Sequence, residues 1–370
     1  MLNFKQINPI GIDLTDQALY AAQFQNTRQG KVVGHLWRQR FEDGALGGEP
    51  DEDLIPILKR VAKTRKFKGK QVNLHLPERH MNCFLVSFDL GADEELEDAI
   101  ARECRRSLSF PLEEAVVDYA SLMESSKKKR RFKAALVAVR RETVDAYLNL
   151  SRKAGLSVGV IDLQLSSLLR LHQYLFKLSN NPVVLCNVDD TTTLLSVVTK
   201  QRILAQRQVH WGIQPIKKRL ITNLELSEGD GQAADMLARY GLMHERLTAA
   251  TGKPPAARQD EADSDLAIYR TMFRLLSPYV EELIHELYQI TGYVRSEMEV
   301  PQFEQIVLYG WASAFKYLDQ YIQKRLNIPT KAVNPMAKLS WNVDTVEFKG
   351  MVGSPFGPAL GLALRGSSWL

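Results

Sequence analysis

Alternating and continuous apolar runs near the start of the chain predict strands rather than long helices. Four such runs are found, at residues 7–13, 18–25, 31–41 and 71–77. The turn-forming residues that begin at Asn26 predict a hairpin between the second run and the third. Acidic residues at 49–53 open a predicted helix that continues to about Thr64 and gains cations toward its end, an order that complements the helix dipole.

A compact unit of mixed helix and strand is predicted next. Its expected elements are a strand at 82–88, a helix at 92–110, strands at 114–122 and 132–140, and a helix at 141–156. Within the first helix Leu96, Ile100, Cys104 and Leu108 recur every fourth residue and form one apolar face. Gly155 is typical of a helix end. A strand at 158–163 and a helix at 164–178 are expected to follow.

The second half of the chain repeats the plan of the first. Three further strand runs stand at 182–190, 193–199 and 201–210, and helical segments reach about residue 296. The Pro-, Ala- and Asp-rich residues 251–265 predict a mobile loop among these helices. A strand at 305–310, a helix to Leu326 and an apolar helix at 355–366 are expected to complete the chain. Two three-strand meanders, each with an acid-bearing first turn, indicate a duplicated α/β domain like that of actin and hexokinase.

The positive charge of the chain is concentrated in two runs. The net charge is +5, and residues 59–70 hold seven cations and no acid, while residues 127–133 hold six cations. One interpretation is a solvated helix end and a hairpin loop. The other is contact with anionic lipid headgroups, which attract each nearby Lys or Arg by about 1 kcal/mol. We expect no nucleic-acid partner, because no known nucleic-acid motif accompanies the basic runs.

The remaining composition is that of a soluble globular protein: 370 residues, 45% hydrophobic and 25% charged. No apolar run reaches the roughly 18 residues that a transmembrane helix needs, and the N-terminal residues do not resemble a signal peptide. Cys83, Cys104 and Cys186 are scattered within apolar patterns, which favours buried, reduced thiols over a metal site. We therefore expect a cytoplasmic protein without a bound metal.

Eight stretches, taken in order, resemble the PilM-type type IV pilus assembly proteins, which are relatives of actin similar to the cell-division protein FtsA. They are GIDLTDQALY, FKGKQVNLHLP, SFPLEEAVVDY, AGLSVGVIDLQ, NVDDTTTLLSVV, ADMLARYGL, LYGWASAFKYLDQYIQKRLNIPTKAVNP and ALGLALRG. The resemblance implies an actin-like, ribonuclease-H-like α/β fold of two duplicated lobes with a small inserted α+β domain. The implied boundaries are 1–78 plus 156–180 for the first lobe, 79–155 for the inserted domain, and 181–370 for the second lobe with a helical subdomain at about 211–300.

The resemblance also implies a partner. Members of the family bind the short cytoplasmic N-terminal tail of a membrane-anchored PilN protein, so this chain is expected at the inner membrane only through its partner. Pilus motor or platform proteins and self-association are further expected contacts. The implied peptide groove lies where the inserted domain meets the first lobe, and the β-rich, apolar segments 79–90 and 132–140 are its expected walls, although no single contact residue is identified.

The family's nucleotide motifs are altered in this sequence. Actin-like ATPases use hairpin glycines to bring backbone N–H groups close to phosphates, an acid to hold Mg²⁺, and a glycine pair beneath the adenosine. The corresponding positions here are Asp13, Thr15, Asp16 and Tyr20 in the first hairpin, Asn187, Asp189, Asp190 and Thr191 in the second, and Gly310 and Trp311 in the adenosine segment. Residues 286–293 resemble a family helix that carries Arg-Ser, and those two positions read Gln289 and Ile290 in this chain.

Electrostatics favours a vestigial cleft without nucleotide. Two like charges about 4 Å apart repel by about 4 kcal/mol at an effective dielectric of about 20, and Asp16, Asp189 and Asp190 would face a triphosphate. Trp311 would fill the adenine position. The sequence thus favours a scaffold with no catalytic residue, and the alternative is an ATPase that binds ATP and Mg²⁺ and regulates pilus assembly.

The same residues also have structural interpretations. The three acids are typical turn residues, Trp311 is equally compatible with a core position, and capping is the favoured role for Asp162 and Gln164 at a strand-to-helix turn. A filament protein that attaches directly to membrane is a weaker third hypothesis, because the final residues LRGSSWL are too short and too uncharged for a membrane helix.

Overall fold

The computed structural model describes residues 7–41, 50, 52–91, 93–124, 131–200, 202–226, 230–242, 259–298, 300–341 and 354–366. The chain forms two compact units, the first made of Met1–Leu171 with Pro358–Leu370 and the second of His172–Gly357. The boundary falls within helix α4 (Gln164–Leu175). Each unit is built around its own sheet.

The first unit contains a five-stranded sheet. Its strands are β1 (Ile10–Leu14), β2 (Ala18–Thr27), β3 (Gly30–Arg40), β4 (Gln71–His75) and β8 (Ser157–Asp162), in the order β3-β2-β1-β4-β8. The first three strands are antiparallel, whereas β4 is parallel to β1 and β8 is parallel to β4. These are the strands and the hairpin that the apolar pattern predicts.

Helices α1 (Leu54–Lys63) and α3 (Arg141–Lys153) share a hydrophobic core with this sheet. Tyr147 and Leu150 of α3 join β1 residues such as Ile12 in that core. Helix α3, the last part of the expected inserted domain of residues 79–155, thus packs on the sheet of the first lobe. The periodicity of residues 141–153 predicts a helix, but it does not indicate against which sheet the apolar face of this helix is buried.

Helix α10 (Gly357–Leu364) packs against β1 in the first unit, although the sequence interpretation assigned it to the second lobe. A side chain at Gly11 would place its Cβ only 2.0 Å from the carbonyl oxygen of Ala359, so only glycine allows this approach. The Asn73 side-chain amide donates to the carbonyl of Leu362 at 3.0 Å. The chain thus returns to its first sheet at the end.

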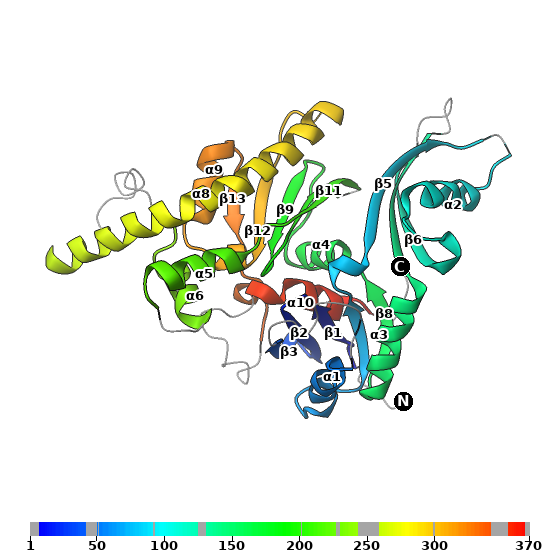
Figure 1. Ribbon diagram of the computed structural model, residues 1–370, viewed down its shortest axis with the longest axis horizontal. Helices are drawn as coiled ribbons and strands as arrows, with labels where there is room; N and C mark the ends of the chain where they lie inside the picture. Colours follow the sequence, from blue (N-terminus) through cyan, green and yellow to red (C-terminus); the bar gives the residue numbers. More distant parts are fainter. Residues whose placement is uncertain are drawn as a thin grey trace. The chain divides into compact units, whose positions relative to one another are not determined.

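A three-stranded antiparallel sheet forms the remainder of the first unit. It contains β5 (Asn82–Asp89), β6 (Ala115–Glu124) and β7 (Arg131–Arg140) in the order β5-β7-β6, with α2 (Leu96–Ser107) beside it (Figure 1). Ile100 and Cys104 of α2 are buried with Leu136, as the four-residue spacing predicts. Cys83 is exposed on β5, so the prediction of three buried thiols is wrong for this cysteine. Residues 127–130 of the second basic run lie outside the described residues.

The second unit repeats the connectivity of the first sheet. Its strands are β9 (Val183–Val188), β10 (Thr193–Val198), β11 (Ile203–Val209), β12 (Gln305–Gly310) and β13 (Thr330–Ala332), in the order β11-β10-β9-β12-β13. Strand β9 is antiparallel to β10 and parallel to β12, as β1 is antiparallel to β2 and parallel to β4. The duplicated meander expected from the sequence is therefore present.

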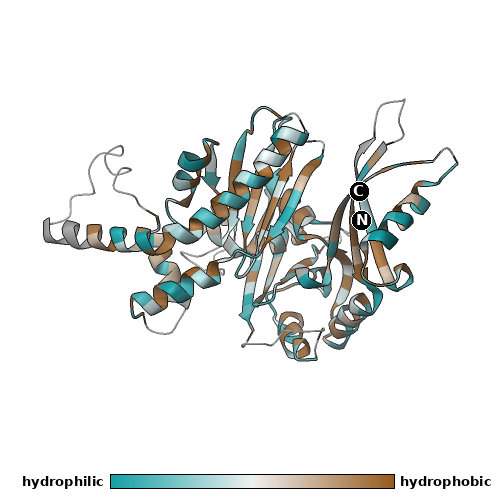
Figure 2. Cartoon of the chain, turned by 45° about the horizontal axis from the view of Figure 1, so that its top comes forward, coloured by the Kyte–Doolittle hydropathy of each residue, from teal (hydrophilic) through white to brown (hydrophobic). Residues whose placement is uncertain are grey.

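One large apolar core joins this sheet to its helices. They are α5 (Ile213–Asn223), α6 (Asp230–Arg239), α8 (Gln259–Glu297) and α9 (Leu318–Leu326). Hydrophobic residues recur along α8 between hydrophilic ones (Figure 2). The mobile loop predicted at 251–265 is wrong from Gln259 onward, where α8 begins, and residues 251–258 lie outside the described residues. Acidic residues at a helix start complement its dipole, so the Asp-rich composition that suggested a loop is compatible with this helix.

Candidate functional site

The turn between β1 and β2 is the first predicted phosphate-facing hairpin, and the backbone N–H groups of Thr15, Gln17 and Ala18 are engaged within the turn. The Thr15 hydroxyl accepts from the N–H of Gln17 at 3.3 Å and from that of Ala18 at 3.0 Å. The N–H of Thr15 itself donates to the Ala18 carbonyl at 3.0 Å. A phosphate-binding hairpin directs such N–H groups at the anion. In this turn a phosphate would have to displace the chain's own hydrogen bonds.

Both acids of the first hairpin have basic partners in the first unit. Asp13 is fully buried, and its Oδ1 lies 2.7 Å from Nδ1 of His75, its neighbour on the parallel strand β4. The exposed Asp16 carboxylate accepts a hydrogen bond from the guanidinium of Arg79, in the short helix η1 (Glu78–His80). The Asp16 charge, which was expected to oppose a nucleotide at this hairpin, is therefore paired with a cation.

The second hairpin, between β9 and β10, lies against the start of α5. The N–H of Ile213 donates to the Asp189 carbonyl at 3.1 Å, and the N–H of Gln214 donates to the Asp190 carbonyl at 2.9 Å. The Asn187 side-chain amide donates to the Asp189 carboxylate at 3.2 Å. Thr191 is exposed. These two N–H groups at the start of α5 are thus taken by hairpin carbonyls rather than offered to an anion.

A buried lysine neutralises the second hairpin. Lys217 of α5 has no exposed surface, its Nζ lies 3.7 Å from Oδ1 of Asp190, and Asp190 is 2% exposed. The same ammonium lies 3.5 Å from the centre of the Trp311 ring, which is also buried. We call Asp190, Lys217 and Trp311 the buried triad. Such a cation–π contact contributes about 2 kcal/mol when it is desolvated.

The buried triad changes two expectations from the sequence. Asp190 does not project toward solvent, so its charge is balanced by Lys217 instead of opposing a phosphate. Trp311 begins the short helix η3 (Trp311–Ala314) and belongs to the core of the second unit. Its structural interpretation as a core aromatic therefore fits the geometry of this unit.

The packing of the second unit requires a glycine at position 310 whether or not a nucleotide binds. The φ of Gly310 is +63°, and a Cβ at this position would lie 2.2 Å from the carbonyl oxygen of Val188 on the neighbouring strand. A close backbone approach and a positive φ both require glycine. The structure thus brings Asn187, Asp189, Asp190, Gly310 and Trp311 together within the second unit, whereas Asp13, Thr15 and Asp16 lie in the first.

The expected partner segments, residues 79–90 and 132–140, are adjacent strands of the three-stranded sheet. Residues Asn82 to Asp89 pair with residues Ala138 to Arg131. Because β7 also pairs with β6, residues 132–140 offer no free backbone edge, and strand addition at this segment is ruled out. The edge strands are β5 and β6. Among the two expected segments, only β5 presents an edge for a peptide.

A protein-family model decides the identity of the chain. The model described as type IV pilus assembly protein PilM matches residues 11–245. The chain belongs to this family. The match contains the first hairpin, the three-stranded sheet and the buried acid Asp190.

Solved structures agree with the fold implied by PilM family membership. A structure described as the PilM-PilN type IV pilus biogenesis complex is similar to this chain with a TM-score of 0.74 and 20% sequence identity, covering 98% of this chain and 100% of that one. The ethanolamine utilization protein EutJ from Carboxydothermus hydrogenoformans is similar with a TM-score of 0.50 and 12% identity, covering 97% of this chain and 92% of that one. The actin-like α/β fold is thereby confirmed.

The partners of the acids are residues that the sequence interpretation missed: His75, Arg79 and Lys217. The sequence could have indicated that Lys217 is buried, because it falls four residues after Ile213 and three before Leu220, on the buried stripe of α5. His75 ends a strand whose last four residues are buried. Arg79 carried no comparable signal, since its contact with Asp16 joins residues 63 positions apart.

Asp162 does more than the predicted capping. Its Oδ1 accepts from the N–H of Leu163 at 2.8 Å, and its Oδ2 pairs with Arg170 at 3.0 Å and with Arg365 at 2.8 Å. It therefore ties α4 to the segment after α10. Gln164 is buried at the start of α4.

The remaining nucleotide-related positions have structural surroundings. On α8, Gln289 accepts a hydrogen bond from Arg207 at 2.5 Å, and Ile290 is buried in the core. Within the described residues, no group of three His, Cys, Asp or Glu side chains could hold a metal ion. In the same part of the chain, no helix is long and apolar enough to span a bilayer.

Proposed function

We propose that this PilM-family chain is a cytoplasmic scaffold of a type IV pilus, or related type II secretion-like, inner-membrane assembly platform. In this proposal it binds the cytoplasmic N-terminal segment of a PilN-type membrane protein and works without nucleotide. The partner is proposed because the similar solved structure is described as a PilM-PilN complex.

A nucleotide-free state is supported because the hydrogen-bonding and charged groups of the two hairpins already have partners within the chain. The Thr15 hydroxyl and the hairpin carbonyls at Asp189 and Asp190 accept from the backbone donors, while Arg79 and Lys217 balance the acids Asp16 and Asp190. To bind there, ATP would have to break these contacts, and the hairpin groups would lose their present partners. We therefore expect calorimetry with MgATP to give no heat beyond dilution. A Kd below about 100 μM, equivalent to about −5.5 kcal/mol, would overturn this proposal.

A second candidate function is ATP-dependent regulation of assembly. It is favoured by Asp13, the acid of the family's first hairpin that this chain keeps. The Oδ2 of Asp13 is buried and has no hydrogen-bond partner among the described residues, which would suit a bound water or cation. Binding of MgATP that is lost in Asp13→Asn would support this alternative.

The calorimetric experiment with MgATP needs a control for folded protein. The same preparation should bind the partner peptide, so that an absence of heat with MgATP cannot be attributed to unfolded protein.

For the partner peptide we propose the β5 edge. Backbone hydrogen bonds to an edge strand offset the cost of ordering a short peptide, and β5 is the edge strand among the two expected segments. Cys83 reports on this site because it is exposed on β5, whereas Cys104 and Cys186 are buried. Burial raises the pKa of the Cys104 thiol and raises that of Cys186 to about 12, so neither forms the reactive thiolate readily.

The test uses this difference in reactivity. A bulky maleimide should label Cys83 selectively, and the labelled protein should lose binding of a synthetic peptide with the partner's N-terminal sequence. Excess peptide should in turn slow the labelling. Cys83→Ser is the matched control, because it should bind the peptide both with and without maleimide treatment. Full peptide binding by the labelled protein would move the site away from β5.

A further inference from the structure

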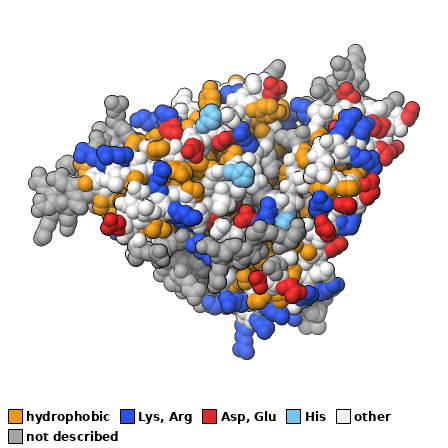
Figure 3. Space-filling view, viewed as in Figure 1, with side chains coloured by type: hydrophobic (Ala, Val, Ile, Leu, Met, Phe, Trp, Pro, Cys, Tyr) orange, Lys and Arg blue, Asp and Glu red, His pale blue; other side chains and the backbone are white. Residues whose placement is uncertain are grey.

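The basic run at 59–70 forms one exposed surface in the first unit. It comprises the second half of α1 and the connection from α1 to β4, and its cations are Lys59, Arg60, Lys63, Arg65, Lys66, Lys68 and Lys70, all of them exposed. We call these residues the basic face. Lys and Arg side chains gather over α1 at the lower end of the space-filling view (Figure 3). The connection enters the amino end of β4, so it lies at the opposite end of the sheet from the Thr15 turn.

The cations of the basic face have no carboxylate partner among the described residues. The Arg60 guanidinium donates to the neutral Gln39 side chain at 3.1 Å, and Lys68 Nζ donates to the carbonyl of Arg65 at 3.3 Å. The nearby acid Glu52, at the other end of α1, pairs with Lys153 instead. That end is about 15 Å from Lys63 along the helix, which exceeds the screening length of about 8 Å at physiological salt.

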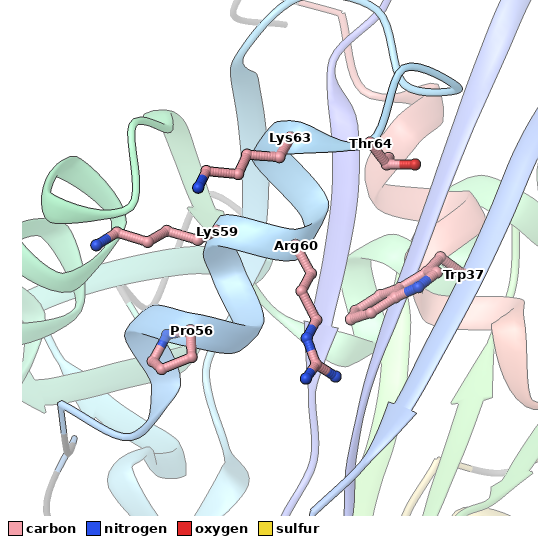
Figure 4. A pocket seen from close by; sticks show the side chains of 6 residues that line it. All are labelled: Trp37, Pro56, Lys59, Arg60, Lys63 and Thr64. Atoms are coloured by element: carbon pink, nitrogen blue, oxygen red, sulfur yellow. The ribbon is translucent and has the colours of Figure 1, made fainter.

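The basic face includes an open groove of about 510 Å³. It is lined by Trp37 of β3 and by Pro56, Lys59, Arg60, Lys63 and Thr64. Arg60 extends toward the half-buried Trp37, while Lys59 and Lys63 extend side by side from successive turns of α1 (Figure 4). The indole lies nearest the Arg60 guanidinium, and an aromatic ring next to a cation is an arrangement that suits the boundary between lipid headgroups and acyl chains.

An exposed apolar side chain stands next to the same face. Ile7 is 57% exposed and immediately precedes Asn8. The Gln23 side-chain amide donates to the carbonyls of Asn8 at 2.8 Å and of Lys68 at 2.7 Å, which holds this end of the chain against the basic connection. The surface therefore combines cations with an apolar residue.

Two alternative explanations account for less of the face. Cations in the last turn stabilise the helix dipole by about 0.3–1 kcal/mol each, but only Arg60 and Lys63 lie there. An acidic peptide would be recognised best by Arg, whose planar guanidinium binds carboxylates in pairs. Five of the seven cations are Lys, a compact hydrated charge that suits diffuse attraction to a charged surface.

We propose that the basic face docks on anionic phospholipid headgroups, with the cations held at the headgroup phosphates and Ile7 directed at the lipid boundary. The contact is peripheral and electrostatic. It does not depend on the proposed partner or on the state of the nucleotide hairpins, because its cations lie on α1 and on the connection from α1 to β4 and not in either hairpin.

The test is co-sedimentation of the full chain with vesicles, with no partner protein present. Vesicles of equimolar phosphatidylglycerol and phosphatidylcholine should bind the protein at about 0.1 M salt, where the Debye length is about 10 Å, and release it at about 1 M, where it is about 3 Å. Pure phosphatidylcholine vesicles should not bind it. Each cation near an anionic surface strengthens binding about fivefold. The triple variant Lys59→Gln, Lys63→Gln, Lys66→Gln should therefore bind about a hundredfold more weakly.

The matched control is the triple variant Lys200→Gln, Lys218→Gln, Lys324→Gln, which removes three exposed lysines of the second unit and changes the net charge equally. It should bind as the unaltered chain does, and both variants should keep their circular dichroism. If both triple variants lost vesicle binding equally, the binding would depend on the net charge of the chain and not on the basic face, which would overturn the proposal. Absence of vesicle binding, together with saturable binding of poly-glutamate, would overturn it in favour of an acidic protein partner.

Discussion

Replacing Lys217 by methionine should destabilise the second unit by several kcal/mol. The substitution keeps most of the apolar stem but leaves the buried Asp190 carboxylate without the ammonium 3.7 Å away. At an effective dielectric of about 20, two unit charges at that distance attract by about 4 kcal/mol. Removing one partner of a buried ion pair costs about 3–5 kcal/mol, because the other charge remains desolvated. The loss of the contact with the Trp311 ring acts in the same direction.

Urea unfolding followed by circular dichroism measures this effect. With a slope of about 3 kcal/mol per molar urea, a loss of about 3 kcal/mol should lower the midpoint of the second unit by about 1 M. Lys218→Met is the matched control on the same helix, since Lys218 is exposed and its loss should change stability by no more than about 0.5 kcal/mol.

A double-mutant cycle separates the ion pair from the other contacts of each residue. Asp190→Asn removes the charge that Lys217 balances, so Lys217→Met with Asp190→Asn should be more stable than the sum of the two single losses predicts. A coupling energy near zero would show that the two charges do not depend on each other. A Lys217→Met variant as stable as the unaltered chain would likewise refute the reasoning about the buried triad.

Two further predictions follow from the second unit. Gly310→Ala should lower the midpoint of thermal unfolding markedly, because its Cβ would lie 2.2 Å from the Val188 carbonyl at a φ of +63°; an unchanged midpoint would mean that β12 shifts freely. Burial lowers the pKa of His172 from 6.5 to about 4. As the pH falls, the unfolded chain therefore takes up a proton on this histidine before the folded chain does. The stability that His172 contributes is complete above about pH 6.5 and is lost as the pH falls toward 4. The predicted loss is about 3 kcal/mol, at 1.36 kcal/mol for each pKa unit, and it should be absent from urea titrations of His172→Phe.

The hydrophobic pattern of the sequence determined the local elements of this protein. Alternation fixed the strands of both meanders, and the four-residue spacing of Ile100 and Cys104 fixed the buried face of α2. Each of these features depends on neighbours within a few residues, whose positions follow from the helix and strand periods. The order of the motifs was also sufficient to indicate the PilM family and the actin-like fold.

Only the tertiary structure decided what the acids of the two hairpins contact. The sequence shows Asp16 and Asp190 as unbalanced charges, whereas the fold brings Arg79 to the first and Lys217 to the second. Tertiary packing likewise returned α10 to the first sheet and buried α3 there. Sheet order and helix packing join residues far apart in the chain, and such contacts depend on burial and charge pairing that no local period encodes.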